Sequence, residues 1–324
     1  MSSKVREYDF GDELEEQFKG LVLSNFHVSY LPAKVFLCGG EYNTGQLFPQ
    51  SMRDRLIKYF DLNDDTPIGN CVQAEDFIDY LKDSTYSDLL QFEDDIAKLS
   101  TLIIICLESP GSLVELGLFT NNPYIANKLL VIAPQDKVEN KDSFIFLGPL
   151  TNLELNSSGS VLIYPWPEND RNEYEHLDII ISDVMAKFKK IPKSKAFDQR
   201  DVAHLVMLIH DIVMISTPIK QYEIEWVLLV LGIEVNEKEL NRYLYLLDKL
   251  GMVKHTTYSN VKYFYDVEGG KRRVKFGRTS NGAIKDENSM KLALRKSFVL
   301  GSDEASKKRQ LVTKQIMQLK KDAK

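Results

Sequence analysis

Short apolar runs alternate with helical patterns over the first 190 residues, and this alternation is the feature that most constrains the fold. The runs are KVFLCGGE (34–41), LIIICL (102–107), LLVIAP (129–134) and VLIYPW (161–166). Between them, helical periodicity marks residues 51–60 and 88–99, and a further helix is expected at 112–121. Because buried strands that alternate with helices build parallel sheets with helices on both faces, we expect an α/β domain over residues 31–190.

A different pattern follows the basic, proline-containing stretch at residues 187–200. Helical spacing predicts helices at 201–215, 221–231 and 236–250, and residues 253–266 alternate around Ser259-Asn260 like a β-hairpin. Helices followed by a hairpin are typical of a winged helix-turn-helix, which we expect over residues 195–270. We expect residues 1–30 to form a helical extension and residues 271–324 a basic tail.

Charge is unevenly distributed along the 324 residues, a length that suits about two domains. The net charge is -6, yet residues 254–324 hold 18 Lys and Arg against 7 Asp and Glu, a balance of +11. Residues 1–253 therefore carry -6 - 11 = -17. We expect any contact with nucleic acid to lie in the C-terminal part.

The candidate nucleic-acid contacts are basic residues of two segments. They are Arg242 and Lys249 on the helix at 236–250, and Lys271, Arg272 and Arg273 in the segment KRRVKFGR. The cluster SKKRQ (306–310) is a further phosphate candidate, and the hairpin aromatics Tyr258, Tyr263, Phe264 and Tyr265 are candidates for base stacking. The alternatives are a solvated helix face, a protein-binding surface and a solvated tail.

Cysteine usage and hydropathy favour a cytoplasmic protein. The three cysteines, Cys38, Cys71 and Cys106, are far apart, which argues against a disulfide framework. The five histidines have no nearby cysteine partner, so we expect no zinc site and no other metal. No run reaches the roughly 18 apolar residues of a membrane helix, and the N-terminus has no apolar signal core.

The segment ESPGSLVELGLF (108–119) places a carboxylate on the helix that follows the buried run LIIICL. Ser112 and Glu115 have the spacing of a capping box, and capping a helix is the alternative role of Glu115. We expect the N-terminus of this helix to favour an ionised carboxylate and to attract anionic groups. An ionised carboxylate at the mouth of an α/β pocket can attack the anomeric carbon of a sugar.

Cleavage of a glycosidic bond also needs a second acid to serve the leaving group. Candidates are Glu93 in QFEDDIAKL, Glu75, Asp76 and Glu108; the alternatives for these acids are a solvated helix face, a helix cap and a structural turn. The expected substrate-binding residues lie in the turns after the strands, at the candidate acid Asp76, and at the start and the end of the helix at 112–121. They are Gly39, Gly40, Asp76, Ser109, Gly111, Ser112 and Asn121.

These residues together carry a family likeness. The runs FLCGG, EDFIDYL, ESPGSLVELGLFTNN, KLLVI and SFIFLGPL follow one another in order and cover most of residues 30–150. In this the chain resembles the effector proteins of retrons, in which a nucleoside deoxyribosyltransferase-like domain is joined to a winged-helix DNA-binding domain. The resemblance implies the flavodoxin-like α/β sandwich of those transferases.

The same resemblance implies an activity and partners. Glu115 corresponds to the nucleophilic glutamate of the ELG motif, and Glu93 stands at the place of the assisting acid, where many transferases carry aspartate. The protein is then expected to be a toxin in anti-phage defence, held inactive by a reverse transcriptase and its multicopy single-stranded DNA (msDNA). Its expected activity is an N-glycosidase that breaks down NAD or related nucleotides without a further cofactor, in an oligomeric complex. The rival readings are a non-catalytic nucleotide sensor and a DNA-binding regulator.

Overall fold

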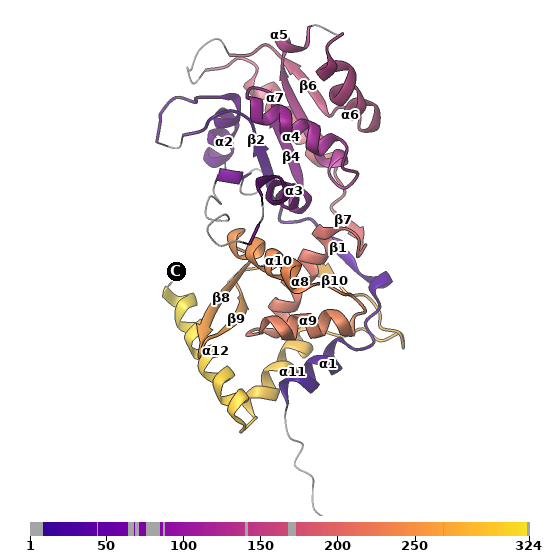
Figure 1. The fold of residues 1–324 in the computed structure, drawn as a ribbon, viewed down its shortest axis with the longest axis vertical. Helices are drawn as coiled ribbons and strands as arrows, with labels where there is room; N and C mark the ends of the chain where they lie inside the picture. The colour runs from indigo at the N-terminus through magenta and orange to yellow at the C-terminus, as the bar shows by residue number, and fades with distance from the viewer. Residues whose placement is uncertain are drawn as a thin grey trace, which may run out of the picture. The chain divides into compact units, whose positions relative to one another are not determined.

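The chain folds into two compact units, and its first and last parts share one of them (Figure 1). The computed structural model describes residues 9–43, 45–63, 68, 71–75, 85–86, 88–139, 142–167, 173–267 and 269–322. Tyr30–Lys193 form one compact unit, here called the sheet unit. Met1–Ser29 and Ser194–Lys324 form the other, here called the helical unit.

The sheet unit is built on a five-stranded parallel sheet in the order β3-β2-β4-β5-β6. Its strands are β2 (Val35–Cys38), β3 (Cys71–Val72), β4 (Leu102–Cys106), β5 (Leu129–Pro134) and β6 (Val161–Tyr164). Its helices are α2 (Met52–Leu62), α3 (Leu89–Leu99), α4 (Pro110–Thr120), α5 (Gln135–Val138), α6 (Thr151–Asn156) and α7 (Leu177–Lys190), with shorter turns η3 (Ala126–Lys128) and η4 (Phe146–Leu150). When these five strands are numbered by their order along the chain, they lie across the sheet in the order 2-1-3-4-5, which is the order of flavodoxin-like sheets. The α/β parallel sheet expected from the sequence is confirmed.

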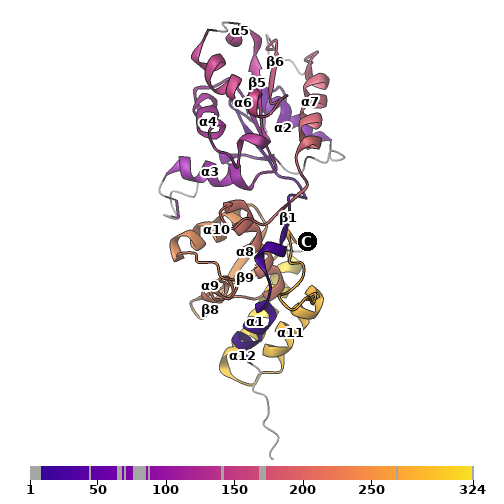
Figure 2. The ribbon, with the colours of Figure 1, turned by 90° about the vertical axis from the view of Figure 1, so that its right-hand side faces the viewer.

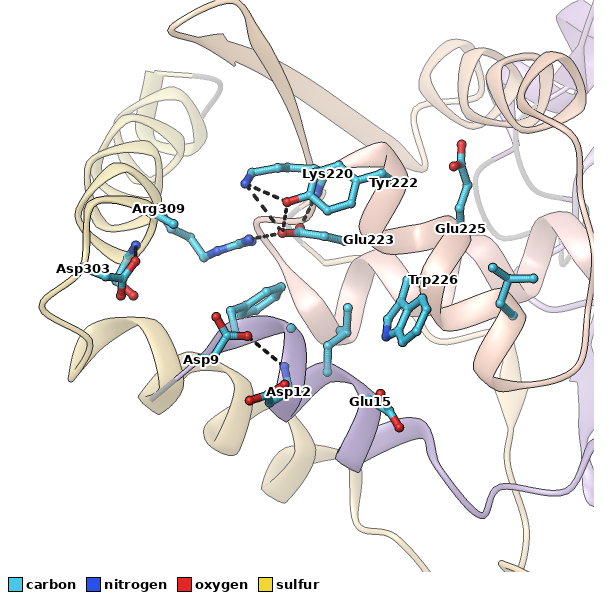
Figure 3. Close-up of a pocket in the computed structure, with 16 residues that line it drawn as sticks. Asp9, Asp12, Glu15, Lys220, Tyr222, Glu223, Glu225, Trp226, Asp303 and Arg309 are labelled. Carbon is cyan, nitrogen blue, oxygen red and sulfur yellow. Dashed lines mark hydrogen bonds and ion pairs between the residues drawn. The ribbon is translucent and has the colours of Figure 1, made fainter. Parts of the chain in front are cut away.

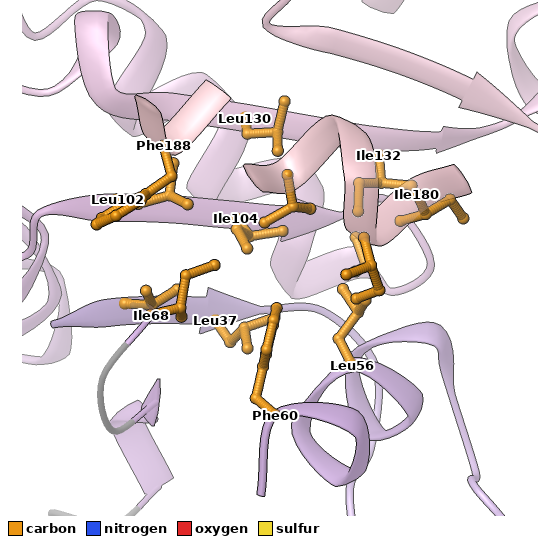
Figure 4. Packing of buried hydrophobic residues seen from close by; sticks show 14 of the residues in the cluster. Leu37, Leu56, Phe60, Ile68, Leu102, Ile104, Leu130, Ile132, Ile180 and Phe188 are labelled. Atoms are coloured by element: carbon orange, nitrogen blue, oxygen red, sulfur yellow. The ribbon is translucent and has the colours of Figure 1, made fainter. Parts of the chain in front are cut away.

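Alternate residues of each strand face opposite layers of helices, which explains why the strands read as continuous apolar runs. Leu37, Ile104 and Ile132 face α2 and α7, where Leu56 and Ile180 are among the residues that close the core (Figure 4). On the other face, α3 and α4 cover the sheet, as Figure 2 shows. All five residues of β4 are buried because helices cover both of its faces.

The helical unit joins elements from both ends of the chain. It contains α1 (Phe10–Phe18), η1 (Leu23–Asn25), β1 (His27–Ser29), β7 (Ser194–Ala196), α8 (Val202–Ser216), α9 (Gln221–Val230), α10 (Glu237–Lys249), β8 (Val253–Tyr258), β9 (Val261–Asp266), β10 (Val274–Lys275), α11 (Glu287–Val299) and α12 (Glu304–Asp322). Strand β1 pairs with β7 on one side and β10 on the other. The Nζ of Lys285 donates to the carbonyl oxygens of Gln17 and Lys19 at 2.8 and 2.9 Å, which satisfies the C-terminal end of α1. The N-terminal segment and the basic tail are therefore integral parts of one unit, in contrast to the separate extension and tail expected from the sequence.

The hairpin predicted at 253–266 is present as β8 and β9. Ser259 and Asn260 both have positive φ, 48° and 60°, as a two-residue type I′ turn requires. The expected linker at 187–200 begins as helix, because α7 continues to Lys190. The two compact units divide between Lys193 and Ser194, within this stretch.

Candidate active site

The candidate site lies at the carboxyl ends of β2 and β4, where the strand order of the sheet reverses. Strand β3 lies on one side of β2 and β4 on the other. Open α/β sheets bind ligands in the crevice at such a reversal. The turn after β2 carries Gly39 and Gly40, and the loop after β4 carries Glu108 and Ser109.

Glu108 ties these two loops to the start of α2. Its carboxylate accepts hydrogen bonds from the backbone N–H groups of Gly40 at 2.9 Å, Met52 at 2.8 Å and Arg53 at 3.0 Å. These amides include two that have no partner within their own helix. Of the roles weighed for Glu108 from the sequence, the structure shows that of a structural acceptor.

Close packing within the protein explains the glycine pair. A Cβ on Gly39 would lie 2.8 Å from the Cβ of Arg53, and one on Gly40 would lie 2.9 Å from the Cβ of Ser51. Gly39 borders the cavity described below, and Gly40 borders a neighbouring pocket. The pair therefore permits the close contact of β2 with α2, whatever ligand binds beside it.

The start of α4 differs from the expected capping box. Ser109 is the N-cap residue: its Oγ accepts from the N–H of Ser112 at 3.1 Å, and the Oγ of Ser112 accepts from the N–H of Ser109 at 3.2 Å. The predicted box between Ser112 and Glu115 is wrong, because the helix begins at Pro110. Glu115 therefore lies in the second turn and has no part in capping the helix.

A cavity of about 310 Å³ brings the two predicted catalytic acids together. Glu93 comes from α3 and Glu115 from α4. The lining residues are Phe36, Leu37, Gly39, Arg53, Ala74, Glu75, Leu89, Glu93, Gly111, Ser112 and Glu115. Apolar side chains form much of this wall, so charged groups inside it are partly removed from water.

Burial is the main cause that raises the pKa of Glu115, to about 7. The nearby carboxylate of Glu93 adds to the rise, while the hydrogen bond from the Cys38 thiol and the charge of Arg53 lower the pKa. The helix N-terminus was expected to favour the ionised form of Glu115, and the raised pKa corrects this expectation. The dipole effect fades beyond the first turn, and desolvation outweighs it.

Glu93 responds to the same surroundings. Burial raises its pKa, and the carboxylate of Glu75 raises it further, against the opposing charge of Arg53. Two carboxyl groups that resist ionisation in one cavity are typical of acid–base and nucleophilic sites.

Arg53 is a site residue that the sequence reasoning missed. Its guanidinium binds Glu75 through two parallel hydrogen bonds, Nη1 to Oε1 at 2.7 Å and Nη2 to Oε2 at 2.6 Å. The side chain of Arg53 is only 5% exposed, and Arg53 follows the buried Met52 in the first turn of α2. The signal that could have identified Arg53 was an arginine in the first turn of the helix that follows the first strand of the sheet. The guanidinium holds the pKa of Glu75 below its ordinary value.

The other predicted substrate-binding residues are dispersed. Gly111 and Ser112 border the cavity, and Ser109 borders the neighbouring pocket. Asn121 caps the other end of α4, about 9 Å beyond Glu115 along the helix axis at 1.5 Å per residue. Asp76 lies outside the described residues.

Two of the basic candidates for nucleic-acid contact are engaged inside the helical unit. The Nε of Arg272 donates to the buried carboxylate of Asp211 at 2.9 Å, and Arg272 also pairs with Glu287. Arg273 is 5% exposed, and its backbone N–H donates to Asp211. A buried carboxylate such as Asp211 needs these donors, so the two arginines serve the fold, while Lys271 is exposed.

The basic candidates on α10 lie away from its apolar face. Arg242 and Lys249 are half-buried, and each lies 5.4 Å from the centre of a tyrosine ring, Tyr243 and Tyr245 respectively. The opposite face buries a leucine stripe that includes Leu240. The helix therefore presents both charge and aromatic surface.

The hairpin aromatics are mostly structural, in contrast to the base-stacking role considered from the sequence. Tyr263 and Tyr265 pack with Val312 and Ile316 of α12. Phe264, on the other face of β9, is buried beside Ile219, with which it exchanges backbone hydrogen bonds. Buried and exposed side chains do not alternate along this part of β9, because α12 covers the face that would otherwise meet water.

The cluster at 306–310 is also partly internal. Arg309 is 3% exposed and pairs with Glu223, with its guanidinium 3.5 Å from the ring centre of Phe10. This arginine holds α12 against α9 and α1, while Lys307 stays exposed. Phosphate contact by Arg309, as considered from the sequence, is therefore corrected.

Within the described parts of the chain, no three His, Cys, Asp or Glu side chains are grouped so that they could hold a metal ion. Likewise, none of the described helices combines the length and the apolar character needed to cross a membrane.

Comparison with known proteins places this chain in a family. Residues 49–255 match the family described as STM3845 retron effector protein. The Escherichia coli protein named "Retron Ec86 putative ribosyltransferase/DNA-binding protein" is 30% identical over 206 residues, which cover 61% of this chain and 64% of that relative. The similarly named Ec73 protein of Escherichia coli is 29% identical over 254 residues, which cover 71% of this chain and 78% of the relative. The match thus spans less than two thirds of the Ec86 protein.

The fold and the site together define an α/β protein with two carboxylates in a cavity at the place where the strand order of the sheet reverses. Apolar side chains form much of the wall of this cavity. The match over residues 49–255 shows that the chain belongs to the STM3845 retron effector family.

Proposed function

We propose that the sheet unit is an N-glycosidase that cleaves the bond between a ribose and its base, in NAD or a related nucleotide. The observation that carries this proposal is the pair Glu93 and Glu115 at one cavity, each with a raised pKa. The word ribosyltransferase in the names of both relatives supports a reaction at a ribose carbon.

In the proposed mechanism Glu115 is the nucleophile. Its ionised carboxylate oxygen forms a bond to C1′ of the ribose while the C1′–N bond breaks, and the bonding electrons leave with the base. Glu93 donates a proton to a base that needs one. A water molecule then attacks C1′ and loses its proton to an ionised Glu93, which has either given its own proton to the base or, with nicotinamide as the leaving group, was ionised before the reaction. The C1′–Glu115 bond breaks, which releases the Glu115 carboxylate and the free sugar hydroxyl.

The charge of the cavity favours a cationic substrate. Three carboxylates, Glu75, Glu93 and Glu115, face one guanidinium, Arg53, which gives -3 + 1 = -2 when all are ionised. The nicotinamide ring of NAD is a cation, so its binding would lower the pKa of both raised carboxyls. The ring also leaves as a neutral molecule, which needs no proton. We therefore propose NAD ahead of neutral nucleosides.

The test uses the purified full chain with NAD and, separately, with deoxynucleosides. We expect free base from NAD, lost by about a thousandfold or more in Glu115→Gln. Glu139→Gln, an exposed acid of the same unit, is the matched control and should keep full activity. Ligand binding without turnover in the wild type, with no partner present, would instead support the nucleotide sensor.

We further propose that α8, α9, α10 and the hairpin β8–β9 form a winged helix-turn-helix that helps the effector bind its retron nucleic acid. The order of these elements and the words DNA-binding in the relatives' names support it. In this proposal reverse transcriptase and msDNA hold the toxin inactive until phage infection. Sequence-specific binding of duplex DNA by the full chain, without glycosidase activity, would favour the DNA-binding regulator.

A further inference from the structure

The helical unit carries a groove of its own, enclosed by α1, α9 and the start of α12 (Figure 3). Its volume is about 490 Å³. The lining residues are Asp9, Phe10, Gly11, Asp12, Leu14, Glu15, Lys220, Tyr222, Glu223, Glu225, Trp226, Leu229, Asp303, Ala305, Ser306 and Arg309. None of these residues belongs to the sheet unit, so the groove is separate from the candidate active site.

One wall is an apolar stripe that faces water. Tyr222, Trp226 and Leu229 of α9 are 60%, 45% and 54% exposed, and their spacing of four and three residues puts them on one side of the helix. Ile224 and Val227, on the opposite side, are fully buried. The core of the unit is thus complete without the stripe. Exposed aromatics beside a groove are typical of protein-binding surfaces.

The rim of the groove is acidic. Asp12 and Glu15 lie on α1, and Figure 3 shows the indole of Trp226 pointing from α9 toward that helix. Asp9 precedes α1, Glu225 lies on α9 and Asp303 precedes α12. This arrangement places carboxylates on both sides of an exposed indole.

The cations of the groove are already engaged. Lys220 and Arg309 both pair with Glu223, at 3.7 Å for the lysine. The lining holds six carboxylates and two cations, so its charge is -6 + 2 = -4. This field repels a phosphate backbone and attracts a cation, which an indole face can also bind.

We propose that this groove docks a basic polypeptide segment of the protein with which the effector assembles. An arginine or lysine of that segment lies over Trp226 between the carboxylates of Glu15 and Glu225. An adjacent apolar side chain covers Leu229. The proposal deepens the retron role by assigning this surface to the protein component of the complex, and it does not depend on the glycosidase activity.

The experiment measures binding of the full chain to the purified reverse transcriptase of its own retron, the probe for the basic partner. Both proteins are treated with nuclease, and affinity is measured by biolayer interferometry at two salt concentrations. We expect Trp226→Ala to weaken binding at least tenfold. Glu225→Lys should weaken it too, and should reduce its dependence on salt because an attractive charge becomes repulsive.

Matched controls separate docking from folding and from catalysis. Leu292→Ala replaces an equally exposed apolar residue outside the groove, and Glu139→Lys reverses an exposed charge in the sheet unit. Both should bind like the wild type, and thermal melts check that every variant is folded. Glu115→Gln should also bind normally, so the binding result can be interpreted even if the glycosidase proposal fails.

Three outcomes would overturn the proposal. The first is unchanged affinity in both Trp226→Ala and Glu225→Lys. The second is binding that nuclease abolishes in the wild type, which would mean that nucleic acid makes the contact. The third is loss of self-association in Trp226→Ala, measured by light scattering, with normal binding to the reverse transcriptase. That result would assign the groove to a second copy of the chain.

Discussion

The cavity of the sheet unit and the groove of the helical unit are both lined by carboxylates, but burial gives these carboxylates different roles. In the cavity, Glu115 lies beside Glu93, and removal from water raises the pKa of both. In the groove, Asp12 and Asp303 lie at the surface, and Glu223 is the buried acid, paired with Arg309. Desolvation suits a carboxylate to bond making and proton transfer, whereas exposure leaves it as a fixed charge that selects a partner.

After the loss expected in Glu115→Gln, the next largest effect at the cavity depends on the leaving group. Glu93→Gln removes a proton donor, so cleavage of neutral nucleosides should fall by about a hundredfold or more. Cleavage of NAD should fall less, because nicotinamide leaves without a proton and only the activation of water by Glu93 is lost. Steady-state rates on the two substrates measure the difference. Equal losses on both would show that Glu93 positions the ribose instead.

A comparison of Arg53 in the cavity with Arg309 beside the groove extends the contrast to stability. Glu223→Gln leaves Arg309 without its carboxylate in a buried site, which should cost about 3 kcal/mol of unfolding free energy. Glu75→Gln should cost about 1 kcal/mol, since Glu75 is half-exposed and Glu93 and Glu115 still face Arg53. Urea titration of both variants measures the difference, with Glu139→Gln as control. Similar losses would mean that the acids of the cavity do not compensate Arg53.

The pH profile tests the raised pKa of Glu115 directly. Because the nucleophile must be ionised, kcat/KM should rise about tenfold per pH unit below pH 7 and level off above it. Glu93→Gln removes a neighbouring negative charge and should move this profile to lower pH. A profile that does not move would show that the charge of Glu93 does not influence the ionisation of Glu115.

The same pKa sets the sign of the stability change. A carboxyl whose pKa is raised from 4.5 to about 7 on folding contributes stability that is fully present below pH 4.5. That contribution is lost as the pH rises to 7. Glu115→Gln should remove this part of the slope in urea titrations made between pH 4.5 and 7.

The smallest effect concerns the half-buried Lys249 and the exposed Lys271 of the helical unit. Lys249→Gln and Lys271→Gln should each weaken binding of a single-stranded oligonucleotide a few-fold. Each should also lower the logarithmic salt slope by about 0.7, the value for one phosphate contact. Fluorescence anisotropy at several salt concentrations measures both, and Lys137→Gln of the sheet unit is the control. Unchanged slopes would place nucleic-acid contact elsewhere.

The sequence predicted the sheet and the order of its elements well because the signals are local. The run at 129–134 coincides with β5, and the positive φ values of Ser259 and Asn260 follow from the turn between two alternating strands. The site was harder to predict from the sequence than the sheet was. Glu93 and Glu115 were named from spacing and resemblance, but the Arg53–Glu75 pair was not, because a contact across 22 residues leaves no local pattern.

The sequence by itself determined β2, β4, β5 and β6 of the sheet, the hairpin β8–β9, and that an acid follows β4 on the next helix. Only the tertiary structure decided that the two ends of the chain share one unit and that Glu115 has a pKa raised to about 7. It also decided that Arg272 and Arg309 pair with acids inside that unit and that Arg273 is buried there. The physical reason is range: backbone preference and periodicity act over a few residues. Burial and ion pairing depend on which distant segments the fold brings together.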